Sequence, residues 1–163
     1  MESRSAQGEG NKVERDDFGR LLFIDKFENG EKVLRTTYYP NEAPKEIIPY
    51  VDGKVCGLKK TFLPAGEPVT IEEWSENYQD GITTVFQNGE KIAEVPYVKG
   101  VKNGIEERYR DGQFVAEEIP WKNGRKHGPC YCYIGEGSHV SWFYEGNEVT
   151  KAQYDRVTRP SMR

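Results

Sequence analysis

Residues 97–104 read YVKGVKNG and residues 121–128 read WKNGRKHG, and these two stretches decide the fold. Each begins with an aromatic residue and has glycine at its fourth and eighth positions. The segments that precede them, EVP at 94–96 and EEIP at 117–120, are also alike. A loop that recurs together with its flanking residues indicates a chain built from internal repeats.

The aromatic position recurs along most of the chain. Successive members are separated by 23, 24, 23, 24 and 23 residues. The segment DFGRLLFIDK at 17–26 resembles the second half of one more unit, so the chain holds about five and a half units. The series consists of Phe27, Tyr50, Trp74, Tyr97, Trp121 and Tyr144.

Each unit predicts two antiparallel strands. After the second glycine, a run such as IEERY at 105–109 alternates in the period-2 pattern of a strand. A turn sequence follows, such as QNG at 87–89, and Asn-Gly favours the positive φ angles of a two-residue hairpin turn. A second strand then leads to the next aromatic residue. The expected fold is all-β: a single elongated antiparallel β-meander of tandem hairpin repeats of 23–24 residues.

One unit has an extra residue. Nine positions separate the turn glycine from the closing aromatic in Gly112–Trp121, whereas eight separate them in Gly89–Tyr97. An extra residue in one strand of a pair is commonly accommodated as a β-bulge, which we therefore expect here.

The two ends of the chain depart from the repeat. Residues 1–16 are polar and predict a disordered tail, residues 17–149 form the repeat domain, and residues 150–163 form a C-terminal cap. TKAQ at 150–153 fits a capping box, which predicts a short helix near 151–158. Tyr154 and Val157 are expected on one face of this helix, covering the last strand.

Composition narrows the possible partners. The net charge of -4 is unlike that of a nucleic-acid-binding protein, which needs clustered Lys and Arg. No apolar run is long enough for a transmembrane helix, and the N-terminus lacks the apolar stretch of a secretory signal. Three cysteines do not form a disulfide framework. We expect a cytoplasmic protein.

The glycine loops and the EVPY and EEIPW connectors resemble the MORN-repeat superfamily, in the variant found in bacterial YwqK-family antitoxin-like proteins. The resemblance covers about residues 18–157. It departs from the pattern at Leu34 (in place of the second glycine), at Glu42-Ala43 (in place of a turn glycine) and at Asn77 (in place of the first glycine). The resemblance implies a non-enzymatic binding scaffold without a cofactor, in which a toxin or another protein is the partner.

The sequence contains a few residue groups that resemble catalytic or metal-binding patterns. His127, Cys130, Cys132 and His139 lie within 13 residues, but their spacing matches no familiar zinc motif, so no metal is expected. A hydrolase built on Cys130 and His127 is a minor alternative. Asp17-Phe18-Gly19 fits a turn better than the kinase magnesium motif, because no other kinase motif accompanies it. No catalytic residue is assigned.

Two binding hypotheses remain. In the first, a broad sheet face binds a protein partner through large aromatic side chains. In the second, the basic loop at 121–128 binds anionic lipid as a peripheral membrane module. The chain is expected to be a monomer or a weak homodimer formed through an edge strand. The candidate contact residues are Trp74, Trp121, Trp142, Lys122, Arg125 and Lys126.

Overall fold

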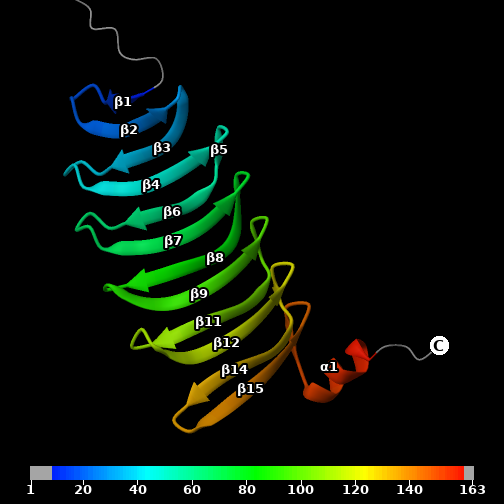
Figure 1. Cartoon of the computed structure of the whole chain (residues 1–163). Helices are drawn as coiled ribbons and strands as arrows, with labels where there is room; N and C mark the ends of the chain where they lie inside the picture. Colours follow the sequence, from blue (N-terminus) through cyan, green and yellow to red (C-terminus); the bar gives the residue numbers. More distant parts are fainter. Residues whose placement is uncertain (1–8, 160–163) are drawn as a thin grey trace, which may run out of the picture.

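The computed structural model describes residues 9–159. It contains a single antiparallel sheet of 16 strands followed by one helix (Figure 1). Along the main path each strand pairs with the strand before it and the strand after it, so the predicted all-β meander is confirmed. The strands of this path are β1 (Gly10–Arg15), β2 (Leu21–Glu28), β3 (Glu31–Tyr38), β4 (Pro44–Val51), β6 (Gly57–Phe62), β7 (Pro68–Ser75), β8 (Tyr78–Gln87), β9 (Glu90–Val98), β11 (Gly104–Arg110), β12 (Phe114–Lys122), β14 (Gly128–Ile134), β15 (Gly137–Tyr144) and β16 (Asn147–Val149).

Three two-residue strands lie off this path, one in each of three glycine loops. The strands β5 (Lys54–Val55), β10 (Val101–Lys102) and β13 (Arg125–Lys126) fold back on β4, β9 and β12. Each glycine loop therefore begins with a tight hairpin and then crosses to the next long strand.

The tight hairpins have the backbone geometry that their sequences predict. In seven turns an Asn, Asp, Lys or Glu near φ +50° is followed by a glycine with positive φ, which is the signature of a type I′ turn. Glu76 and Asn77 both adopt positive φ, so this turn forms although Asn77 replaces the glycine. Asn tolerates the left-handed region better than most residues.

The second glycine of each loop is needed for space as well as for φ. A Cβ atom at Gly104, whose φ is +120°, would lie 3.0 Å from Pro96 Cγ. Gly57 and Gly128 face Pro49 and Pro120 in the same way, at 3.2 and 3.3 Å. The prolines that precede Tyr50, Tyr97 and Trp121 therefore each pack against the glycine eight residues later.

The expected cause of the extra residue in Gly112–Trp121 is wrong. The β8–β9 hairpin has a two-residue turn, because Gln87 pairs with Glu90, and it contains a bulge at Ile92. The β11–β12 hairpin has an equivalent bulge at Ala116, but Arg110 pairs with Phe114 across a three-residue turn. The turn accommodates the extra residue, and the bulge is a feature that both units share.

The expected N-terminal tail is also wrong in part. Residues 10–15 form β1, in which Val13 pairs with Ile24 of β2. Although the segment is polar, it forms a strand because its backbone groups pair with those of β2 through hydrogen bonds. Residues 1–8 of the expected tail lie outside the described residues.

The C-terminal helix is confirmed. Helix α1 (Lys151–Thr158) begins with a complete capping box, in which Gln153 N donates to Thr150 Oγ1 and Thr150 N donates to Gln153 Oε1. The Tyr154 ring packs 5.1 Å from the Trp142 ring of β15. Val157 does not cover the last strand as expected, since it is 49% exposed.

Alternation along the strands gives the sheet two unlike faces. The Trp121 face is the face that carries Trp121, Glu106 and Ile119, and the Ile105 face is the face that carries Ile105, Glu107 and Glu118. The cross-strand pairs place all of the buried side chains of the described residues on the Trp121 face: Asp25, Thr83, Ala93, Val95, Glu106 and Ile119. The small core of this sheet therefore lies on one side.

Candidate partner-binding surface

The Trp121 face neutralises its buried charges internally. Glu106 is only 2% exposed, and it accepts hydrogen bonds from Lys102 Nζ at 2.8 Å, Arg108 Nε at 2.9 Å and Trp121 Nε1 at 2.9 Å. Burial acts to raise the pKa of Glu106, but the hydrogen bonds from Lys102 and Arg108 outweigh it and lower the pKa. Arg35 similarly lowers the pKa of Asp25 through a bidentate pair.

Aromatic rings on the Trp121 face are covered by basic side chains. Lys102 Nζ lies 4.4 Å from the centre of the Trp121 ring, and Lys59 Nζ lies 5.5 Å from that of Trp74. Lys126 Nζ lies 5.0 Å from the ring of Phe143. Because cation–π contacts of this kind stabilise neighbouring units, Trp74, Trp121 and Lys126 already take part in packing between repeats.

Trp142 lies on the opposite side of the sheet from the other two tryptophans. It pairs with Pro129 across β14–β15, which places it on the Ile105 face, and Tyr154 of α1 packs against its ring. The three candidate tryptophans therefore do not form one surface, and each is only partly exposed.

The basic loop is partly neutralised. Lys122 and Arg125 are exposed, but Arg125 Nη1 lies 3.5 Å from Glu145 Oε2. Lys126 points to the Trp121 face, as its contact with Phe143 shows. The six candidate contact residues are thus divided between two faces and a loop, and the structure does not bring them together.

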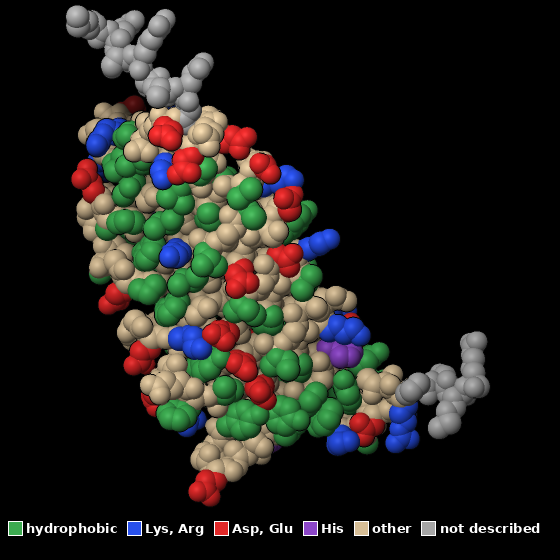
Figure 2. Space-filling model, viewed as in Figure 1, with side chains coloured by type: hydrophobic (Ala, Val, Ile, Leu, Met, Phe, Trp, Pro, Cys, Tyr) green, Lys and Arg blue, Asp and Glu red, His purple; other side chains and the backbone are tan. Residues whose placement is uncertain are grey.

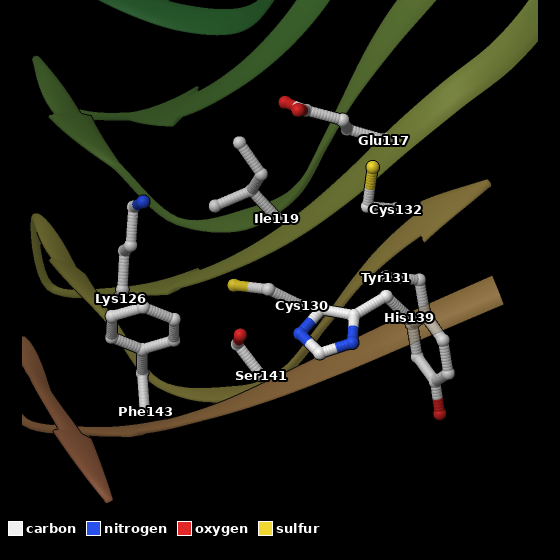
Figure 3. Close-up of a pocket in the computed structure, with 9 residues that line it drawn as sticks. All are labelled: Glu117, Ile119, Lys126, Cys130, Tyr131, Cys132, His139, Ser141 and Phe143. Carbon is white, nitrogen blue, oxygen red and sulfur yellow. The ribbon is translucent and has the colours of Figure 1, made fainter. Parts of the chain in front are cut away.

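The cysteine and histidine residues do not form one cluster. Cys130 and Cys132 line a shallow pocket of about 190 Å³ on the Trp121 face with His139, whereas Tyr131 points away from them (Figure 3). His127 lies elsewhere, 5.1 Å from the Tyr144 ring and 5.9 Å from the Tyr154 ring. Within residues 9–159, no group of three or more His, Cys, Asp or Glu side chains is placed to hold a metal ion.

The Cys130 thiol is also poorly suited to act as a nucleophile. Burial raises the pKa of Cys130, which disfavours the thiolate. The His127 ring is tilted against the Tyr144 ring and edge-on to the Tyr154 ring, and its Nδ1 lies 3.2 Å from Glu145 Oε1, so its neighbours are aromatic rings and a carboxylate. This geometry gives no support to a hydrolase built on Cys130 and His127.

A second hollow lies at the centre of the Trp121 face. It has a volume of about 790 Å³, and its lining includes the small side chains of Thr83 and Ala93. Glu72 lies at its rim and accepts hydrogen bonds from Thr70 Oγ1 and Trp74 Nε1. The polar groups around this hollow are therefore largely satisfied by each other.

The Ile105 face is different, because its large apolar side chains are uncovered. Leu58 is 51%, Ile82 39% and Ile105 58% exposed. Tyr78 of β8, Val98 of β9 and Val101 of β10 are exposed as well. Figure 2 shows hydrophobic side chains along the visible face and acidic side chains grouped over part of it. An uncovered apolar face of this kind is a candidate interaction surface.

Sequence reasoning missed this surface, although the signal is present. The residue directly after the second loop glycine is Leu58, Ile82 or Ile105 in three successive units. The regular spacing of the repeat indicates that these three residues occupy equivalent positions in their units. It does not indicate that the sheet face on which they lie is exposed.

The fold and the two faces define a class: an all-β repeat protein made of one sheet, with one packed face and one open face. The sequence matches no protein-family model and no curated protein. Among the described residues there is no helix both long enough and apolar enough to span a membrane.

Proposed function

We propose that this chain is a non-enzymatic protein-interaction scaffold, which binds a protein partner through a broad face of its sheet. The observation that carries the proposal is the uncovered apolar side of a single-layered sheet, where Leu58, Ile82 and Ile105 are each more than one-third exposed. Burying such side chains against a partner removes apolar area from water, which is the main favourable term in protein association.

The resemblance to MORN repeats is consistent with this proposal and suggests its biological form. In that form the chain is an antitoxin-like protein of the bacterial cytoplasm, and the partner is a toxin or effector. The resemblance rests on the glycine loops and their connectors, which determine the turns rather than the binding chemistry.

The test is affinity purification of the full chain at its native expression level from its own host, with chemical cross-linking. The expected result is one protein recovered in stoichiometric amount. Recovery of no stoichiometric protein under mild, low-salt conditions would contradict the scaffold function.

Binding of anionic lipid is a second candidate function, favoured by one observation. Lys99 and Lys122 are exposed, and no acidic side chain of the described residues lies within 4 Å of either. Lipid binding predicts flotation with anionic vesicles that is lost in a Lys99→Glu, Lys122→Glu variant. Because Arg125 is paired with Glu145, we expect this attraction to be weak.

A further inference from the structure

The cross-strand register of the Ile105 face aligns its side chains in two parallel rows. The apolar row consists of Leu58 of β6, Ile82 of β8 and Ile105 of β11. Pro96 of β9 lies directly opposite Ile82, and Glu73 of β7, whose Oε2 accepts a hydrogen bond from Ile82 N, lies directly opposite Leu58. The acidic row consists of Glu94 of β9, Glu107 of β11 and Glu118 of β12, which oppose one another. Ile105 and Glu107 are two residues apart on one strand, so the rows lie about 7 Å apart.

The spacing within each row matches an α-helix laid across the strands. Members of the apolar row are two strands apart, or about 9.6 Å, and residues i and i+7 of a helix are about 10.5 Å apart. Members of the acidic row are one strand apart, or about 4.8 Å, close to the helical pitch of about 5.4 Å. A helix with apolar residues every seven positions and basic residues one turn apart would meet both rows.

The acidic row is costly for the isolated chain. Like charges directly opposite each other on neighbouring strands destabilise a sheet. Lys91 Nζ lies 2.9 Å from Glu94 Oε1, but no Lys or Arg of residues 9–159 lies within 4 Å of the carboxylates of Glu107 and Glu118. Their hydrogen bonds come from the hydroxyl groups of Tyr109 and Tyr133, which leave the negative charges in place. A cationic partner would offset this repulsion.

The chain itself shows how a helix is seated on this face. The apolar row continues through Pro120 and Pro129 to Trp142, and helix α1 packs on that end. It presents an aromatic ring, Tyr154, to the Trp142 ring, and Lys151 Nζ lies 5.2 Å from the centre of the same ring. One apolar and one basic side chain of a helix thus already contact one end of the row.

We propose that the Ile105 face binds a basic amphipathic helix of the partner protein. The helix lies across β6 to β12, next to the site that α1 occupies. Its apolar side chains contact Leu58, Ile82 and Ile105, and its Lys or Arg side chains pair with Glu94, Glu107 and Glu118. This assignment rests on the proposed scaffold function, and it adds the face and the chemistry of the partner.

The probe is a synthetic helical peptide of about 18 residues, or five turns, with leucine at every seventh position and lysine one turn apart along the adjoining flank. A matched peptide has glutamate in place of lysine. Binding of each labelled peptide to the full chain is measured by fluorescence anisotropy at low and high salt. Only the lysine peptide should bind, and salt should weaken its binding.

Two variants of the rows are compared with two matched controls. Ile105→Asp and Glu107→Lys should each weaken binding of the lysine peptide at least about tenfold. Ile134→Asp and Glu136→Lys change the same residue types in the exposed β14–β15 turn, and should leave binding unchanged. Thermal melting of all four variants verifies that each is folded.

Three results would overturn the assignment. The first is equal binding of the lysine and glutamate peptides, or no binding of either. The second is that Ile105→Asp weakens binding no more than Ile134→Asp does. The third is a homodimer of the unmodified chain that Ile105→Asp abolishes, since a second copy would then occupy the row. If the host partner still copurifies with the Ile105→Asp and Glu107→Lys variants, the scaffold function is retained but the assignment of the binding site to the Ile105 face is wrong.

Discussion

Gly104 illustrates how a single backbone position closes each glycine loop. Its φ of +120° lies outside the region that L-residues favour, and a Cβ atom would lie 3.0 Å from the Pro96 ring. A side chain at position 104 would therefore meet both an unfavourable backbone conformation and a close contact with Pro96. Gly100 has a φ of +81°, and a Cβ atom there would meet only the edge of the Tyr78 ring, at 4.0 Å.

We therefore expect Gly104→Ala to lower the free energy of unfolding by about 1–3 kcal/mol. Gly100→Ala should cost less, because it carries the backbone strain without the close contact. The measurement is chemical denaturation followed by circular dichroism. Gly10→Ala is the control, since its Cβ atom would meet nothing within 4 Å and its φ is unrestricted. A Gly10→Ala variant as destabilised as Gly104→Ala would show that the loop geometry is not the cause.

Glu106 is the buried carboxylate that joins two basic side chains, Lys102 and Arg108, on the Trp121 face. Its pKa is lowered from the ordinary value of 4.5, and that of Asp25 is lowered from 3.8. A carboxylate with a lowered pKa in the folded state contributes stability above its unfolded pKa, and this contribution is lost as the pH falls through the folded pKa. The chain should therefore lose stability progressively below about pH 4.5.

Glu106→Gln should cost about 1–3 kcal/mol at neutral pH, because Lys102 and Arg108 lose their shared carboxylate. The variant should also lose less stability than the unmodified chain when the pH falls from neutral to about 3, since one linked carboxylate is gone. Denaturation curves at several pH values test both expectations. Glu136→Gln, in the exposed β14–β15 turn, should follow the unmodified chain at every pH.

At the next level of structure, α1 is a short helix held mainly by one aromatic side chain, Tyr154, which packs against three rings. Tyr154 packs against Trp142 at 5.1 Å, against His127 at 5.9 Å and against Tyr144 at 6.4 Å. Its capping box supports the first turn, but an eight-residue helix is too short to be stable alone in water. Its position therefore depends on the tyrosine.

Tyr154→Ala should release the helix and uncover Trp142. We expect a red shift of tryptophan emission and concentration-dependent self-association, because an apolar ring becomes exposed at the end of the sheet. Fluorescence and analytical ultracentrifugation measure the two effects. Val157→Ala should change neither, since Val157 is already 49% exposed. Deletion of residues 150–163 should reproduce the tyrosine variant, and failure to do so would show that α1 does not protect this end.

At the scale of the whole molecule, the sheet is a row of units with two ends. The main contacts of each strand are with its neighbours in the sheet, as in other repeat arrays. Such an array exposes an edge strand at each end unless something covers it. The N-terminal edge of the described residues is β1, whose polar side chains Lys12, Glu14 and Arg15 discourage edge pairing.

Removal of residues 1–15 should lower the melting temperature and promote self-association, because β2 with Phe23 and Ile24 becomes the edge. Size-exclusion chromatography with light scattering and thermal melting provide the readouts. A second truncation that removes only residues 1–8 retains β1, so the difference between the two isolates the contribution of this strand. If the two truncated chains behave alike, β1 does not protect the edge.

Local residue patterns are enough to predict the repeat, the all-β meander, the tight hairpin turns and the capped helix. These features depend on local residue types: Asn-Gly pairs, period-2 alternation and a Thr-x-x-Gln box act over a few neighbouring positions. The sequence does not predict strand β1, because a polar edge strand is stabilised by backbone pairing with its partner. It also does not predict the three-residue turn at 111–113, because an extra residue can be accommodated either in a turn or in a bulge.

Which face of the sheet is packed depends on contacts between strands that lie far apart in the sequence. Alternation along a strand shows that two faces exist, but burial depends on cross-strand neighbours and on the bend of the sheet. The structure places the buried Glu106 with its Lys102 partner, the Trp121 ring covered by Lys102 and all of the buried side chains on the Trp121 face. It leaves Leu58, Ile82 and Ile105 open on the other face, beside three adjacent glutamates. The six candidate contact residues are predicted from residue type alone. Residue type does not distinguish a tryptophan that packs between repeats from one that binds a partner.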